Sequence, residues 1–203
     1  MPLDFSVIPQ IDKKIYKIIN EYQKSKGQIL TEDDLKCILF KKLHEIEELS
    51  ELKQTQDLNI FASSIHSELS WFDDKNRLTI KPDLTILEPE NLSILHGCFG
   101  YKVTLPSKQC NFYGKAILFE LKFIRYKIGI SKATFEKQIL NDFNKINRLF
   151  NRLDTQGYPD EVFCYFIIIN KTDRKCSEFD SFLAEYRNAK RFKIIYGSGN
   201  VAF

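Results

Sequence analysis

The sequence lacks the features that mark a membrane protein or a multidomain chain. Hydrophobic residues make up 43% of the 203 residues, but no apolar run approaches the roughly 20 residues that a transmembrane helix needs. The opening segment, MPLDFSVIPQIDKK, has no basic stretch followed by an apolar one, so we expect no signal peptide and a cytoplasmic location. Repeats and Pro/Gly-rich linkers are also missing, which predicts a single domain over residues 1–203.

Cysteine is scarce and scattered. The five cysteines form no CxxC pair and are odd in number: Cys37, Cys98, Cys110, Cys164 and Cys176. A structural zinc site or a disulfide framework is therefore not expected. Cys37 and Cys164 lie in apolar stretches, and we expect both to be small core residues.

Excess charge is small, with a net charge of +3, but its distribution is uneven. From Glu120 to Arg152 there are eight basic and three acidic residues, whereas from Thr31 to Glu51 there are three basic and seven acidic residues. The net charge alone does not indicate a nucleic-acid-binding protein. The positive charge is instead concentrated in one segment of the chain.

The order of predicted elements is typical of an α/β protein. Helical periodicity predicts helices near residues 10–25, 31–52, 132–153 and 178–190, with Thr31 as the N-cap of the second. Strands are expected within 77–87, 115–124, 161–170 and 191–197. The Pro- and Gly-containing segment 88–114 is interpreted as an irregular insertion with room for a short hairpin. This order predicts a mixed central sheet covered by helices on both faces.

Charged residues within two of these strands need an explanation, because burial of an unpaired charge is costly. Glu120 and Lys122 are two residues apart in an apolar strand, so both side chains leave the same face. Asp83 falls on the face opposite Leu84 and Ile86, and it lies beside Glu120 if the two strands are antiparallel neighbours. Two close carboxylates repel each other, and a hard divalent cation such as Mg²⁺ relieves this repulsion.

Pro82-Asp83, followed one strand later by Glu120-Leu121-Lys122, resembles the motif of the PD-(D/E)xK nuclease superfamily of restriction and repair enzymes. The resemblance implies that Asp83 and Glu120 hold Mg²⁺, or Mn²⁺ as a substitute, together with the carbonyl of Leu121. It also implies that Lys122 orients or activates the attacking water. The implied activity is metal-dependent hydrolysis of phosphodiester bonds in nucleic acid, most simply as a DNA endonuclease.

The resemblance also implies a restriction-endonuclease-like fold. The family core is a helix, a three-stranded meander, a crossover helix and a further strand, and this order matches residues 31–170. Residues 1–30 would then form an N-terminal helical extension. The long separation between the two halves of the motif departs from the family pattern and requires segment 88–114 to be an insertion between core strands.

An additional acid in this family often comes from the first helix or from the element after it. Glu68, just before the meander, is our candidate for that role, with an exposed acid at a strand edge as the alternative. An acid on the 31–52 helix competes with it, and the candidates are Glu45, Glu47 and Glu48. A solvated acidic face is the more usual explanation for those three residues.

Side chains that can donate hydrogen bonds follow the predicted 115–124 strand, which carries Glu120 and Lys122, and recur along the 132–153 helix. We interpret them as contacts to the nucleic-acid backbone, and the candidates are Arg125, Lys127, Lys132, Gln138, Asn141, Lys145 and Arg148. The helical members could instead form a solvated face, and Asp142 could simply pair with Lys145.

Two alternatives are compatible with the sequence. In the first, Glu120 and Lys122 are only a structural pair in an ordinary sheet. In the second, the chain is a weak or inactive nuclease-fold module that binds nucleic acid or a protein partner. Oligomeric state is open, and a homodimer or a larger defence or mobile-element complex would suit the enzyme.

Overall fold

A mixed five-stranded sheet forms the centre of the protein. The computed structural model describes residues 5–72, 78–94, 103–105, 110–112, 114–157, 161–187 and 189–200. Strand order is β12–β11–β10–β6–β3, with β3 (Ile65–Ser67), β6 (Leu84–Leu87), β10 (Ala116–Ile124), β11 (Val162–Asn170) and β12 (Phe192–Ser198). The last three strands are parallel to one another, whereas β6 is antiparallel to both β10 and β3.

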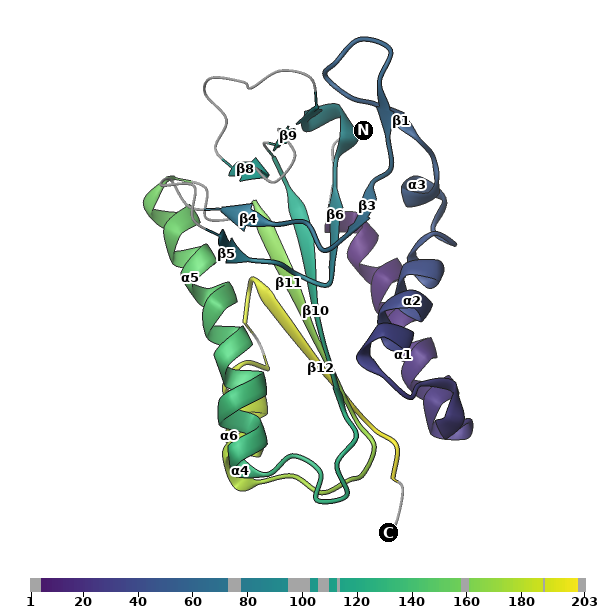
Figure 1. Cartoon of the computed structure of the whole chain (residues 1–203), viewed down its shortest axis with the longest axis vertical. Helices are drawn as coiled ribbons and strands as arrows, with labels where there is room; N and C mark the ends of the chain where they lie inside the picture. Colours follow the sequence, from purple (N-terminus) through teal and green to yellow (C-terminus); the bar gives the residue numbers. More distant parts are fainter. Residues whose placement is uncertain are drawn as a thin grey trace.

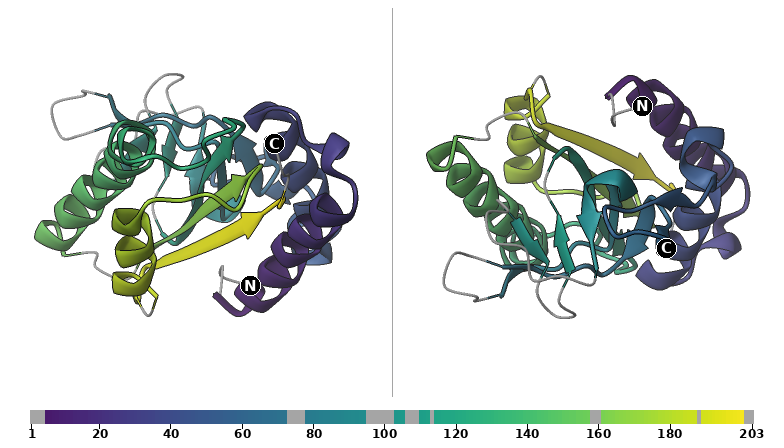
Figure 2. Two further views of the ribbon diagram at one scale, coloured as in Figure 1. Left: turned by 90° about the horizontal axis from the view of Figure 1, so that it is seen from below. Right: turned by 90° about the horizontal axis from the view of Figure 1, so that it is seen from above.

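Helices cover both faces of this sheet (Figures 1 and 2). One layer consists of α1 (Ile8–Lys24), α2 (Glu32–Leu43) and the short α3 (Glu47–Ser50). The opposite layer consists of α4 (Lys132–Thr134), a π-helical segment η5 (Phe135–Leu140), α5 (Asn141–Thr155) and α6 (Ser177–Glu185). The predicted α/β architecture with a mixed, doubly covered sheet is confirmed. No helix in the described part of the chain is long and apolar enough to cross a membrane.

Short elements surround the upper end of the sheet in Figure 1. They comprise η1 (Phe5–Val7), η3 (Pro89–Asn91), β1 (Lys53–Gln54), β2 (Phe61–Ala62), β4 (Trp71–Phe72), β5 (Leu78–Ile80), β7 (Leu92–Ser93), β8 (Val103–Leu105) and β9 (Cys110–Phe112). The short helix η2 (Lys26–Gln28) instead follows α1 at the lower end of Figure 1. Segment 88–114 thus contains a small three-stranded sheet of order β7–β9–β8. Residues 95–102, 106–109 and 113 of this predicted insertion lie outside the described residues.

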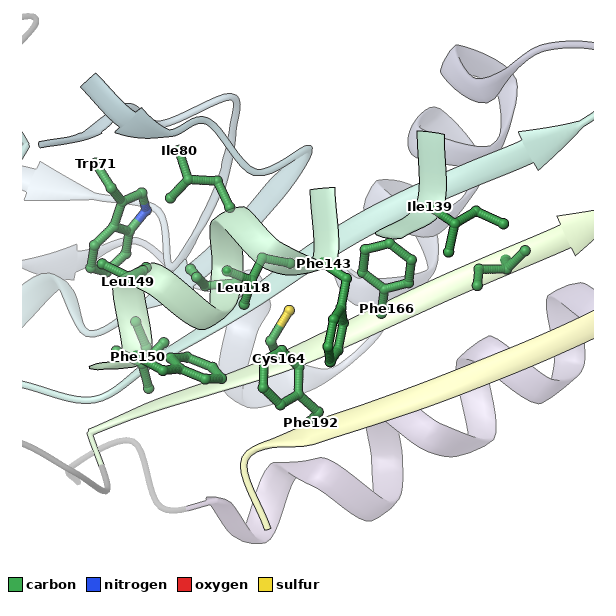
Figure 3. Close-up of a cluster of buried hydrophobic side chains, with 14 of the residues drawn as sticks. Trp71, Ile80, Leu118, Ile139, Phe143, Leu149, Phe150, Cys164, Phe166 and Phe192 are labelled. Atoms are coloured by element: carbon green, nitrogen blue, oxygen red, sulfur yellow. The ribbon is translucent and has the colours of Figure 1, made fainter. Parts of the chain in front are cut away.

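Alternating side chains of β10 pack into two separate cores. Leu118 joins the cluster beneath α5, whereas Phe119 joins the cluster beneath α1 and α2. Figure 3 shows the first cluster, in which the Phe143 ring packs against Phe166 and Phe192. Because each face of β10 is covered, a charged side chain on this strand is buried unless it lies near an opening between the layers.

Three sequence predictions are corrected here. The 31–52 helix is interrupted between α2 and α3, because Ile46 adopts an extended conformation (φ −90°, ψ 117°) while its side chain stays buried. Segment 77–87 is two strands, because β5 pairs with β4 and only β6 joins the central sheet; Pro82, which cannot donate a ladder hydrogen bond, lies at the break. Cys37 is exposed and is not a core residue, whereas Cys164 is buried as expected.

Candidate active site

Asp83 lies opposite Glu120 because of the register between β6 and β10. These strands are antiparallel, with Leu84 paired to Phe119, so Asp83 immediately precedes the first paired residue. Residues directly opposite each other on neighbouring strands share a face, and Glu120 shares its face with Leu118, which packs beneath α5. Continuing the register by one residue therefore places Asp83 and Glu120 on the same face. The Asp83 carboxylate accepts a hydrogen bond from the Leu121 amide, with an Oδ2–N distance of 2.8 Å. The sequence predicts that the two acids are neighbours if their strands are antiparallel, and the strands are antiparallel neighbours.

Lys122 lies at the centre of a group of carboxylates from three elements. Its Nζ is 3.0 Å from Glu120 Oε1 on the same strand and 3.0 Å from Asp142 Oδ2 on α5. A third carboxylate, that of Glu32, lies 3.6 Å away at the start of α2. We refer to Glu32, Asp83, Glu120, Lys122 and Asp142 as the Lys122 cluster.

Glu32 reaches the cluster from the first turn of α2. Thr31 caps this helix in a capping box with Asp34, which fixes the position of the turn. From there one carboxylate oxygen of Glu32 accepts a hydrogen bond from the Phe123 amide at 3.1 Å. Sequence reasoning considered an acid on this helix but did not select Glu32, because nothing in a run of three acids distinguishes the one that turns toward a strand 91 residues away.

Electrostatics within the cluster follow from burial. Burial raises the pKa of Glu120 to about 7, outweighing the opposing effect of the adjacent Lys122 ammonium. Burial also raises the pKa of Asp83. For Lys122, burial acts to lower the pKa, but the carboxylates of Glu120, Glu32 and Asp142 outweigh it and the pKa is raised. The cluster thus holds a firmly protonated amine beside a carboxyl group that titrates near neutrality.

Asp142 has the opposite character to Glu120. Although burial opposes ionisation, Lys145 and Lys122 hold the pKa of Asp142 below its usual range. The predicted pairing of Asp142 with Lys145 is confirmed. Its second contact, with Lys122, was not foreseen, because the sequence does not show that this part of the helix crosses over β10.

The carboxylate of Glu68 is held outside the Lys122 cluster. It is half exposed and paired with Lys81 and Lys36, which lower its pKa to about 2. Only its backbone contacts the site, because the Glu68 amide donates to the Asp83 carbonyl at 3.1 Å. A catalytic role for Glu68 stays a prediction.

The competing acids near the end of the predicted 31–52 helix also lie apart from the cluster. Glu45 pairs with Lys14 and Lys42, and Glu48 accepts a hydrogen bond from Gln10. These contacts join α1 to the region of α2 and α3. Glu47 is exposed. Glu32 is therefore the acid of this region that contacts Lys122.

The predicted nucleic-acid contacts lie along the loop after β10 and along η5 and α5. Arg125, Asn141 and Arg148 are exposed. Lys132 pairs with Glu178, and Lys145 pairs with Asp142. Of the remaining two, Gln138 donates to the Tyr126 hydroxyl at 3.4 Å, and the Lys127 carbonyl accepts from the Arg174 guanidinium.

The donor atoms available for a metal ion are oxygens. Among the described residues, no group of three or more His, Cys, Asp or Glu side chains is arranged to hold a metal. The predicted ligand set is smaller, since it consists of two carboxylates, Asp83 and Glu120, and the Leu121 carbonyl. Carboxylates on opposite positions of neighbouring strands favour a compensating cation, and Mg²⁺ prefers oxygen ligands and retains several waters. The residues thus fit the expected ion in chemical type.

Comparisons with protein-family models, with curated proteins and with solved structures found no match to this chain. Its function must therefore be inferred from its own residues.

Proposed function

We propose that the chain is a Mg²⁺-dependent nuclease of the PD-(D/E)xK type, with a restriction-endonuclease-like fold, and that it hydrolyses phosphodiester bonds in DNA. One observation carries this proposal: the antiparallel register of β6 and β10 brings Asp83 opposite Glu120 and onto the face that carries Lys122. The order of helices and strands, with a crossover helix between two parallel strands, also supports it.

Asp83, Glu120 and the Leu121 carbonyl are the proposed ligands of the ion. When bound, a divalent ion would lower the pKa of a water molecule and offset negative charge on the scissile phosphate. Glu120 is suited to this role, because burial raises its pKa to about 7 despite the adjacent Lys122, and a bound cation would stabilise its ionised form. Hydrolysis then consists of attack by water oxygen on phosphorus and cleavage of one phosphorus–oxygen bond.

Lys122 supplies fixed positive charge in this scheme. Its raised pKa means that it stays an ammonium group throughout the physiological range, so it donates hydrogen bonds rather than accepting a proton. We assign it the orientation of the attacking water and stabilisation of charge that develops on phosphate oxygens. Asp142 holds the ammonium from the α5 side and acts as its positioning residue.

Binding of the nucleic-acid backbone is assigned to the basic residues beyond the strand. Arg125 and Lys127 directly follow β10, and Lys132 begins α4. Such contacts carry no sequence information and weaken with salt. A homodimer would supply two active sites for the two strands of a duplex.

The test is cleavage of plasmid, linear duplex, single-stranded DNA and RNA by the full-length protein with Mg²⁺, Mn²⁺ or EDTA. Asp83→Asn and Lys122→Ala should each lower the metal-dependent rate by about 100-fold or more. Lys14→Ala is a matched control, because Lys14 is also ion-paired but contacts Glu45 away from the cluster. Glu68→Gln tests the remaining predicted acid.

Absence of cleavage on every substrate, with no Mg²⁺ binding by calorimetry, would overturn the enzymatic proposal. The alternative of an inactive nuclease-fold module would then remain.

A further inference from the structure

Two large apolar side chains are exposed in the loop between β10 and α4. Tyr126 is 44% exposed and Ile128 is 63% exposed. Each is preceded by a basic residue, Arg125 and Lys127, and segment 125–132 carries three bases and no acid. An exposed aromatic ring flanked by cations suits a ligand that offers both an aromatic face and negative charge.

This loop is held in place by the neighbouring loop after β11. Gly129 has a φ of +67°, and a Cβ atom at this position would lie 2.1 Å from the Arg174 carbonyl oxygen. The Ile130 amide donates to the same carbonyl at 3.0 Å, and the Gly129 amide closes a turn onto the Tyr126 carbonyl at 2.9 Å. Figure 1 shows the two loops side by side beyond the ends of β10 and β11. Tyr126 is therefore presented by a fixed turn.

The neighbouring loop adds further positive charge. It carries three bases, Lys171, Arg174 and Lys175, and one acid, Asp173. The Arg174 guanidinium donates to the Lys127 carbonyl at 3.4 Å, so the two basic loops are joined directly. Lys132 pairs with Glu178, and Lys175 pairs with Asp180. The six bases of the two loops still outnumber these two acids and Asp173, so the surface around Tyr126 complements a polyanion.

Tyr126 is also connected to the Lys122 cluster. Its hydroxyl accepts a hydrogen bond from Gln138 at 3.4 Å. Gln138 precedes Asp142 by four residues, about one helical turn, and Asp142 contacts Lys122. The Tyr126 hydroxyl therefore contacts η5, which continues into α5, the helix whose Asp142 contacts the proposed catalytic lysine. Tyr126 also follows Lys122 by only four residues in the chain.

We infer that Tyr126, flanked by Ile128 and the bases of the two loops, is a stacking platform for an unpaired base of single-stranded nucleic acid. In a duplex the faces of the bases are already stacked, so an exposed ring gains little from it. An unpaired base offers its face to the ring, and the adjacent cations bind its phosphates. The inference deepens the proposed function, on which it rests, by naming a strand with unpaired nucleotides next to the scissile phosphate as the preferred substrate.

The test is fluorescence anisotropy of the full-length protein in EDTA, with three labelled DNA probes of equal length. The probes are a single strand, the corresponding duplex, and a single strand with abasic positions in its centre. Tyr126→Ala should weaken single-strand binding by about 5- to 150-fold, the range expected for loss of one stacked base. Duplex and abasic binding should change by less than about twofold. Tyr126→Phe, which keeps the ring, and Tyr16→Ala, which removes a similarly exposed tyrosine on α1, should retain affinity.

Equal losses on the single strand and the duplex, unchanged single-strand affinity in Tyr126→Ala, or an equal loss in Tyr126→Phe would each overturn the inference. The apolar pair would then be assigned to a protein partner. Failure of the proposed function gives a different result: single-strand binding that depends on Tyr126, without metal-dependent cleavage. Cleavage without a role for Tyr126 in binding would keep the nuclease and remove only the platform.

Discussion

Replacement of Glu120 by Gln should stabilise the fold at alkaline pH. Glu120 is buried beside Lys122 on β10, and its side chain is only 10% exposed. Gln keeps the shape of the residue and an oxygen that can accept from the Lys122 amine. It therefore mimics the protonated carboxyl group and removes the cost of holding a charge in this place.

The magnitude follows from the pKa of Glu120. Its folded value of about 7 compares with the ordinary value of 4.5. At about 1.36 kcal/mol per pH unit, this difference corresponds to about 3 kcal/mol. Because the folded state binds the proton more tightly than the unfolded state, the stability of the wild type relative to Glu120→Gln falls as pH rises from 4.5 toward 7. The advantage of the variant should be absent below this window and constant above it.

The measurement is urea denaturation of both proteins in EDTA between about pH 4 and pH 9. This range extends about two pH units above the folded-state pKa of Glu120, which is about 7. Glu45→Gln is the control, because ion pairs with Lys14 and Lys42 lower the pKa of Glu45 and its removal should give no stabilisation at alkaline pH. If Glu120→Gln is less stable than the wild type at pH 9, the reasoning is refuted. Added Mg²⁺ should stabilise the wild type and not the variant if Glu120 is a ligand.

Three other perturbations probe the elements that position the site. Thr31→Ala removes the cap that orders the start of α2 and should lower the free energy of unfolding by about 1 kcal/mol in urea. Gly129→Ala should lower the melting temperature, because the left-handed turn leaves no space for a Cβ against the Arg174 carbonyl; Gly27→Ala, where nothing lies within 4 Å, is its control. Asp142→Asn should destabilise the fold at neutral pH, because nearby ammonium groups, despite burial, hold the pKa of Asp142 low. This loss should shrink in a pH series below the ordinary value of 3.8, as the wild-type carboxylate is protonated.

The long elements could be predicted because their apolar patterns are set by the layers around them. β11 lies between two parallel strands, and the unbroken apolar run in 161–170 reflects burial on both faces. The interruption of the 31–52 helix could not be predicted, because Ile46 and Leu49 fit the helical period and are buried in either conformation. Tertiary packing decides such cases, and periodicity does not record it.

Part of the site could be predicted for a similar reason. The parity of side chains on a strand is a local property, so Glu120 and Lys122 could be assigned to one face and Asp83 to the same face once antiparallel pairing was assumed. Glu32 and Asp142 could not be assigned, because their contacts with Lys122 depend on how two helices cross β10. How a helix crosses a distant strand is a long-range feature, and it produces no regular residue spacing from which it could be predicted.

The position of the acids has a structural cause in the unequal lengths of β6 and β10. β6 pairs with β10 only as far as Phe119, while β10 continues to Ile124. Beyond that point the amides of Leu121 and Phe123 lack a strand partner on this side, and the carboxylates of Asp83 and Glu32 accept their hydrogen bonds instead.

Leaving a buried amide unsatisfied costs about 1–3 kcal/mol, so this edge requires acceptors whether or not a metal binds. An alanine in place of Asp83 would therefore confound loss of stability with loss of function. The Asp83→Asn substitution retains an acceptor oxygen for the Leu121 amide and removes only the charge. It is thus the variant whose inactivity, in a protein that is still folded, would indicate a catalytic role for the carboxylate.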